Sequence, residues 1–277
     1  MGAKCVVVGE VSKPLADAIE EKLVGVAYVP TPIEFATWFQ PLAKAGVARF
    51  EGSIVEVSRD FLARDWVIEG DCEALEIARR YSSRLGLLAS ITVPGPFTLA
   101  TIATYRGRRL VENPHRATAL VPLAASILSA VSDMGFGKIV LWEKTACSLC
   151  GELGARHGYS RWLIAEALSY VLDHSRGSVC VYLGPCTNPY AYEAIAEAGA
   201  KCVGVKGVKA LATLLSEVGD EIEEVLLDPL PAQSVKASRL PPITPCTEVD
   251  RGADPRSVVK RIAISRELCS SLVAAPP

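Results

Sequence analysis

Short runs of apolar, β-branched residues alternate along the chain with longer stretches in which apolar residues recur every three or four positions. The run over 5–9, for example, precedes a helical pattern over 12–23. A short apolar run predicts a buried strand, and the longer period predicts an amphipathic helix. We predict eight strands, over residues 5–9, 26–30, 87–95, 138–143, 178–184, 201–207, 223–228 and 241–246. A helix follows each strand except the seventh, which is the pattern of a parallel sheet.

Two architectures suit this alternation, a (β/α)₈ barrel and a doubly wound open sheet. An open sheet rarely needs eight strands, and it usually carries a glycine-rich phosphate loop after its first strand. Here that turn reads Gly9-Glu10-Val11-Ser12, which is not such a loop. We therefore predict an α/β fold, a single (β/α)₈ TIM barrel over residues 1–277. Alternating polar and apolar residues add an antiparallel excursion near 47–58.

Composition excludes several classes of partner. The chain has 29 basic and 31 acidic residues, a net charge of −2, and so lacks the basic surplus of a nucleic-acid-binding protein. The longest apolar run, 117–131, is broken by Pro122 and is too short to span a membrane. The N-terminus lacks a signal-peptide pattern, so we expect a cytoplasmic protein. Asparagine, glutamine and methionine are scarce, which hints at a thermophilic source.

The carboxyl ends of barrel strands are where barrel enzymes place their chemistry. Ionised residues end several predicted strands here, among them Glu143, Lys206 and Asp228. We expect Lys206 to pair with Glu143 or Asp228, or with an anionic small-molecule substrate, because a lone ammonium at a barrel mouth is costly to desolvate. Glu143 and Asp228 are the candidates for proton transfer. The alternative is that these groups form salt bridges on a solvated rim.

The segment ITVPGPFTLA (91–100) resembles the third-strand motif of the superfamily of cobalamin-independent methionine synthase and uroporphyrinogen decarboxylase. Pro94 and Pro96 end the strand, Gly95 permits a tight turn, and Thr98 is suited to cap the next helix. The segments 179–195 and 241–250 are similar to two further motifs of the methionine synthase branch. The resemblance implies a methyltransferase barrel, with Glu10, Gly95 and Thr98 at substrate-binding positions.

For the methionine synthase branch the resemblance also implies zinc, which activates a thiol substrate as its thiolate. The family holds the ion with one histidine, one glutamate and two cysteines. The matching positions here are Gly184 for the histidine, Lys206 for the glutamate, and Cys186 and Cys246 for the cysteines. Two of the four ligands are therefore absent from this chain, and a cation replaces one of them.

A C-x-x-C pair, Cys147 and Cys150, follows the fourth predicted strand and offers a replacement. Four thiolates suit tetrahedral zinc, and less readily an iron–sulfur cluster. One prediction is therefore a metal site made of Cys147, Cys150, Cys186 and Cys246. A Cys147–Cys150 disulfide, a Cys186–Cys246 disulfide, or free thiols are also open. The remaining cysteines lie in predicted strands and helices, and we assign them to core packing: Cys5, Cys72, Cys180, Cys202 and Cys269.

His157 lies in a loop after the C-x-x-C, on the side expected to be catalytic, and is the one histidine suited to ligation or acid–base work. The function predicted from these residues is methyl transfer involving a thiol at a cysteine-ligated metal. One alternative is a metal-free decarboxylase or lyase that uses Lys206 against an anionic substrate. The other is a non-catalytic barrel that only binds a ligand. The sequence leaves the oligomeric state open.

Overall fold

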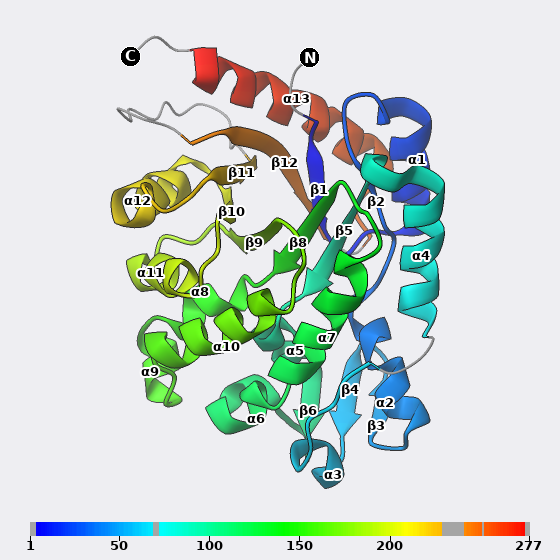
Figure 1. The fold of residues 1–277 in the computed structure, drawn as a ribbon, viewed down its shortest axis with the longest axis vertical. Helices are drawn as coiled ribbons and strands as arrows, with labels where there is room; N and C mark the ends of the chain where they lie inside the picture. The colour runs from blue at the N-terminus through cyan, green and yellow to red at the C-terminus, as the bar shows by residue number, and fades with distance from the viewer. Residues whose placement is uncertain (1–3, 69–71, 229–240, 251, 275–277) are drawn as a thin grey trace.

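Parallel strands form a ring at the centre of the computed structural model, which describes residues 4–68, 72–228, 241–250 and 252–274 (Figure 1). Eight strands are hydrogen-bonded in the order β1-β12-β11-β10-β9-β8-β5-β2. Their bounds are β1 (Val6–Gly9), β2 (Val29–Pro30), β5 (Ala89–Pro94), β8 (Lys138–Trp142), β9 (Val179–Gly184), β10 (Cys202–Lys206), β11 (Glu224–Asp228) and β12 (Ile243–Val249). A parallel bridge between Cys5 and Ala27 joins β1 to β2 and nearly closes the ring. The predicted TIM barrel is confirmed.

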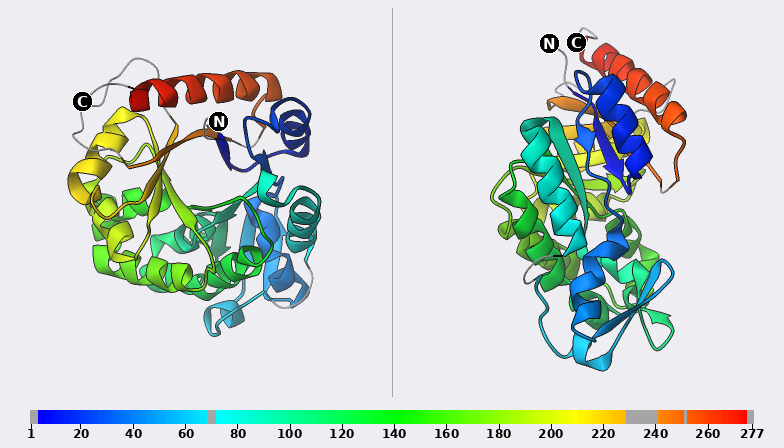
Figure 2. Two further views of the ribbon diagram at one scale, coloured as in Figure 1. Left: turned by 45° about the horizontal axis from the view of Figure 1, so that its top comes forward. Right: turned by 90° about the vertical axis from the view of Figure 1, so that its right-hand side faces the viewer.

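Helices follow the strands and surround the ring, as the view along the barrel shows (Figure 2, left). The longer ones are α1 (Lys13–Leu23), α4 (Glu73–Leu85), α7 (Val121–Ser132), α10 (Arg161–Asp173), α11 (Pro189–Glu197), α12 (Val208–Val218) and α13 (Pro255–Ala274). The shorter ones are η1 (Phe35–Phe39), α2 (Gln40–Lys44), α3 (Arg59–Leu62), η2 (Gly86–Leu88), α5 (Pro96–Ile102), η3 (Leu110–Glu112), α6 (Pro114–Thr118), α8 (Thr145–Leu149) and α9 (Glu152–Arg156). None of the described helices is both long and apolar enough to cross a membrane.

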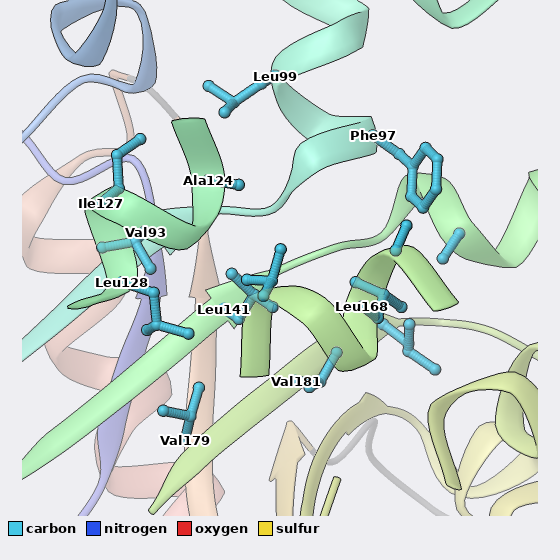
Figure 3. Close-up of a cluster of buried hydrophobic side chains, with 14 of the residues drawn as sticks. Val93, Phe97, Leu99, Ala124, Ile127, Leu128, Leu141, Leu168, Val179 and Val181 are labelled. Carbon is cyan, nitrogen blue, oxygen red and sulfur yellow. The ribbon is translucent and has the colours of Figure 1, made fainter. Parts of the chain in front are cut away.

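The strands bury both of their faces, which explains their continuous apolar runs. Val93, Leu141 and Val181 point outward and pack against Leu128 of α7 and Leu168 of α10 (Figure 3). Burying one such side chain stabilises the fold by about 1.5–3 kcal/mol. The alternate residues point inward and fill the barrel: Val6, Val8, Val140, Cys180, Tyr182, Cys202, Leu226 and Cys246.

A second, smaller sheet extends from the barrel and lies at the lower end of Figure 1. It contains β3 (Ala48–Glu51), β4 (Ile54–Val57), β6 (Ala103–Tyr105) and β7 (Arg108–Arg109). β3 and β4 pair antiparallel over the stretch where polar and apolar residues alternate in the sequence. β4 then pairs in parallel with β6, which follows the Gly-Pro-Phe-Thr turn. The excursion is thus attached to the barrel beside β5.

Candidate functional site

Glu248, in β12, lies at the centre of a charged cluster at the C-terminal end of the barrel. Its Oε1 accepts a hydrogen bond from Lys144 Nζ at 2.7 Å, and its Oε2 accepts one from the Tyr182 hydroxyl at 2.8 Å. Lys206 Nζ lies 3.5 Å from Oε2. Burial alone would raise the pKa of Glu248, but the hydrogen bonds from Lys144 and Tyr182 outweigh it and lower the pKa. This carboxylate is therefore held in its charged form by two lysines and a phenol.

Neighbouring strands bring these groups together. β8 leads into Lys144, β9 carries Tyr182 and β10 ends at Lys206. The Tyr182 ring stacks on Trp142 with centroids 5.0 Å apart, and Lys144 Nζ lies 5.1 Å from the Trp142 ring centroid. Gly204 makes room for the tyrosine, because a Cβ there would lie 2.4 Å from Tyr182 Cδ2. The mouth therefore combines an aromatic wall with two ammonium groups.

Asp228 ends β11 beside this cluster and is itself buried. Its Oδ2 accepts the Glu248 backbone N–H at 3.0 Å and a hydrogen bond from Arg261 of α13 at 3.2 Å. Burial raises the pKa of Asp228, and the hydrogen bond from Glu248 and the charge of Arg261 only partly offset it. We predicted that Lys206 would pair with an acid at this face. It does so, but the acid is Glu248 rather than Glu143 or Asp228.

Glu143, directly after β8, is fully buried beneath the first turn of α5. Its Oε2 accepts the backbone N–H groups of Phe97 (3.1 Å) and Thr98 (3.4 Å). Burial raises its pKa to about 8 although these hydrogen bonds act in the opposite direction. A Cβ on Gly95 would lie 2.1 Å from the same oxygen, so any larger residue there would displace the Glu143 carboxylate. Glu143 thus positions the turn and is not exposed to a substrate, contrary to its predicted catalytic role.

The other predicted substrate-binding residues also position backbone segments. Thr98 does not cap α5, whose N-cap is Gly95; instead its hydroxyl donates to the Trp142 carbonyl at 2.8 Å. Glu10 Oε1 accepts the Phe35 N–H at 2.7 Å and so holds the start of η1 beside the mouth. The Phe35 and Trp142 rings lie 6.2 Å apart.

His157 is exposed at the C-terminal end of α9, in the outer helical layer. Its backbone N–H closes the last turn of that helix by hydrogen bonding to the Gly154 carbonyl at 3.0 Å. The structure therefore places this predicted acid–base residue among solvated helix ends, while the charged cluster is built on strands.

The predicted four-thiol metal site is not assembled. Cys147 of α8 forms a disulfide with Cys186, and Cys150 is a free thiol at the end of α8. Cys246 lies inside the barrel, because β12 continues to Val249, three residues beyond its predicted end. Cys186 instead packs in the outer layer between strands and helices. Cys186 and Cys246, two of the four predicted ligands, therefore do not meet at a common site.

The zinc that the resemblance implies does not fit its expected positions. Gly184 has no side chain to offer, and Cys186 is already bonded to Cys147. Lys206 brings a positive charge to the third position. At the fourth position, burial raises the pKa of the Cys246 thiol well above its usual range. We therefore assign no metal chemistry to the barrel mouth.

Several solved structures have the same arrangement of strands and helices. The chain has the fold of the vitamin B12-independent methionine synthase barrel. A putative synthase from Listeria monocytogenes superposes with a TM-score of 0.60 at 12% identity, covering 93% of this chain and 83% of that one. A synthase from a Shewanella species, in complex with selenomethionine, gives 0.59 at 14% identity, covering 99% and 100%. A methyltransferase from Methanosarcina mazei gives 0.61 at 11% identity, covering 97% and 94%.

Comparison of the amino-acid sequence with known families and proteins does not assign this chain to a family. No protein-family model matches the chain, and no curated protein matches it. The structural likeness, at identities of 11–14%, therefore supports the fold, and the function must be argued from the residues at the mouth.

Three residues of the mouth cluster were missed in the sequence. Lys144 follows Glu143 directly, and Tyr182 lies in an apolar run where it reads as core. Glu248 was placed beyond the end of the last strand. The alternation of side chains along a strand could have found two of them, because residues two positions apart point to the same face. Glu248 lies two residues after the inward-facing Cys246, and Tyr182 lies two residues after the inward-facing Cys180.

Proposed function

We propose that the C-terminal mouth of this barrel binds a small amino-acid substrate through its carboxylate, and that the protein is a methyl-transferring enzyme acting at sulfur. The observation that carries the proposal is the pairing of two ammonium groups, Lys144 and Lys206, with a single carboxylate, Glu248, beside an exposed end of the barrel. Positive charge therefore exceeds negative charge at Glu248 itself.

Each ammonium group has three N–H donors. Glu248 accepts one hydrogen bond from Lys144, and Lys206 faces Glu248 only as an ion pair at 3.5 Å. The two side chains remain 33% and 26% exposed, so their other donors face solvent. A substrate carboxylate can take these donors in charge-assisted hydrogen bonds. Asp228 and Arg261 form a neighbouring pair of opposite charge and leave this excess unchanged.

The aromatic wall indicates what the rest of the substrate is. The Trp142 and Tyr182 rings stack on each other, and Lys144 lies over the Trp142 ring. Aromatic rings make favourable contacts with divalent sulfur, about 0.3–1.5 kcal/mol each. The Shewanella synthase of the same fold was solved with selenomethionine, an amino acid with a methylated chalcogen. Methionine and its demethylated thiol are therefore the substrates that we infer for this mouth.

In this proposal the chain's own residues perform binding and orientation. Lys144 and Lys206 hold the carboxylate, and Trp142 contacts the sulfur-bearing chain, with the buried Tyr182 ring stacked behind it. Glu143 and Gly95 fix the α5 turn at the rim. Positioning of this kind places the sulfur for in-line attack on a bound methyl donor.

Isothermal titration calorimetry tests the binding step, with methionine, selenomethionine and homocysteine as probes. We expect the variant Lys144→Met with Lys206→Met to weaken binding at least about tenfold, because two charge-assisted hydrogen bonds are lost. Lys209→Met is the matched control, since this exposed lysine follows Lys206 by three residues on α12. Absence of binding to the wild type, or equal affinity in the double variant, contradicts the proposal.

Methyl transfer is tested separately by supplying homocysteine with a methylated folate or with methylcobalamin and detecting methionine by mass spectrometry. We expect product with the wild type and with Lys209→Met, and strongly reduced product with the double variant. Binding without any product from either donor would contradict the enzymatic part of the proposal and leave a ligand-binding barrel.

One observation favours a second candidate, a metal-free decarboxylase or lyase. Asp228 has a raised pKa and lies in register with Lys206 on the neighbouring strand. A carboxyl group with a raised pKa beside an ammonium group is suited to proton transfer on an anionic substrate. The product separates the two candidates: a lyase shortens the carbon skeleton of a carboxylate substrate, whereas a methyltransferase leaves it intact.

A further inference from the structure

A second chemical cluster lies at the opposite, N-terminal end of the barrel, and the mouth does not use it. Cys202 and Glu224 begin β10 and β11, and Cys180 is the second residue of β9. Cys202 is the register partner of both Cys180 and Glu224, so the three residues lie at one level of three adjacent strands. Their ligand atoms all lie within 4.8 Å of one another. In the described part of the chain, no other group of three histidine, cysteine or acidic residues is this close.

The two cysteines form a disulfide inside the barrel, where both are buried. This corrects our assignment of Cys180 and Cys202 to simple core packing. Glu224 points to the same place and is held by Lys138 Nζ and by the Thr244 hydroxyl, the latter at 2.6 Å. The side chains of Lys138 and Glu224 are only 11% and 25% exposed. A carboxylate and a cation therefore already occupy a confined space beside the sulfurs.

We propose that, when the disulfide is reduced, Cys180, Cys202 and Glu224 bind one soft divalent cation of the zinc class, so that the disulfide and the metal complex are alternative states of one site. Two thiolates and a carboxylate are ligands that zinc accepts in tetrahedral geometry. The fourth position falls to a water molecule or to the Thr244 hydroxyl, which already contacts Glu224. The site needs no rearrangement of strands, because the register alone brings the three ligands together.

Charge balance supports a divalent ion. Two thiolates and one carboxylate carry three negative charges, and Lys138 supplies one positive charge beside them. A divalent cation brings the buried cluster to neutrality, which is the state that a low-dielectric interior favours. A thiol must lose its proton to become a ligand of zinc. Metal binding therefore displaces one proton from each thiol.

The redox step is a two-electron reduction. A phosphine reductant is oxidised to its phosphine oxide with an oxygen atom from water, the S–S bond breaks, and each sulfur takes up one proton. The cation then replaces these two protons. Because the N-terminal end of a barrel contributes to stability rather than to catalysis, the expected effect of the metal is on the folded state of the barrel. The inference is therefore independent of substrate binding at the mouth.

Cobalt(II) is the probe, since its thiolate complexes absorb strongly through sulfur-to-metal charge transfer. The full-length wild type is reduced with a phosphine, desalted without oxygen and titrated with Co²⁺; the oxidised protein is titrated in parallel. We expect one Co²⁺ per reduced chain with a thiolate charge-transfer band, and no such band in the oxidised protein. Zinc added afterwards should bleach the band by displacement.

Matched variants locate the site. Cys180→Ala with Cys202→Ala should abolish the band, and Glu224→Gln should weaken Co²⁺ binding at least about tenfold by removing one charged ligand. Cys147→Ala with Cys186→Ala removes the other disulfide, in the outer layer beside α8, and should leave the band unchanged. The reduced wild type needs no substitution, so a folding defect in a variant does not decide the result. No band in the reduced wild type, or a band that survives loss of Cys180 and Cys202, overturns the proposal.

Discussion

Each end of the barrel holds a glutamate in an ion pair with lysine, and the two glutamates are held differently. At the C-terminal mouth, Glu248 accepts from Lys144 and Tyr182 and also faces Lys206. At the N-terminal base, Glu224 is held by one lysine and one threonine beside a disulfide. The mouth therefore has an excess of positive charge. The base gains negative charge when its disulfide is reduced and its thiols ionise.

This difference underlies the two different ligands that we propose for the two ends. A second ammonium group at the mouth favours an anionic substrate, whereas two latent thiolates at the base favour a cation. The strands between them contribute the same apolar layers to both ends. The same barrel core can thus support two unrelated sites, because only the first and last residues of each strand reach its ends.

Removing either disulfide should cause a large loss in the free energy of unfolding. The two losses test whether each end of the barrel is stabilised by its disulfide. The bonds span 39 residues for Cys147–Cys186 and 22 residues for Cys180–Cys202. The loop-entropy model then predicts losses of about 4 and about 3.5 kcal/mol in the free energy of unfolding for the paired alanine variants. Guanidinium unfolding without reductant measures both. A pair of substitutions that leaves the unfolding free energy unchanged would show that its bond does not form.

Neither pairing could have been predicted from the sequence, and the reason is physical. A disulfide between strands depends on their register, and Cys180 and Cys202 become partners only once β9 and β10 are aligned. The strands themselves were predictable because both faces are buried. β8, for instance, was predicted over 138–143 and runs over Lys138–Trp142.

Only some residues of the mouth could be predicted from the sequence, because the pairing of strands decides which side chains meet there. Lys206 and Asp228 end apolar runs, so a polar residue at that point marks the strand end. Glu248 and Thr247 look like loop residues, yet both are buried in β12. Inward-facing positions near a barrel end accept polar groups that find partners, and those partners come from other strands. A sequence pattern shows the polar residue but not its partner.

Replacing one lysine at each end should lower the free energy of unfolding by different amounts, because the two ion pairs are buried to different degrees. Lys138→Met leaves Glu224 without its ammonium partner in a confined site, and we expect a loss of about 3 kcal/mol. Lys206→Met leaves Glu248 with Lys144 and Tyr182, and the lost pair is partly exposed, so at most about 1 kcal/mol is expected. Urea unfolding of both variants measures the difference. A larger loss for Lys206→Met would mean that the base is the more hydrated end.

An effect specific to the mouth is a pH dependence of stability that arises from Glu143. Its pKa is about 8 in the folded protein against 4.5 for an exposed glutamate. Below about pH 4.5 both states hold the proton, so the contribution is fully present there. Between these values the folded state retains a proton that the unfolded state has released, and stability falls as pH rises, by at most about 1.4 kcal/mol per pH unit. Above about pH 8 both states are ionised and the loss is complete.

Urea midpoints recorded at about pH 5 and about pH 8 test this slope. Glu143→Gln keeps a carbonyl oxygen to accept from Phe97 and Thr98 but has no proton to release, so we expect its midpoint to vary less with pH than that of the wild type. Glu224→Gln, at the base, leaves Glu143 in place and should keep the wild-type slope. If Glu143→Gln instead showed the full wild-type slope, the titrating group would lie elsewhere. Glu143 would then be ionised beneath the α5 turn at neutral pH, stabilised by the N–H groups of Phe97 and Thr98 more strongly than burial opposes it.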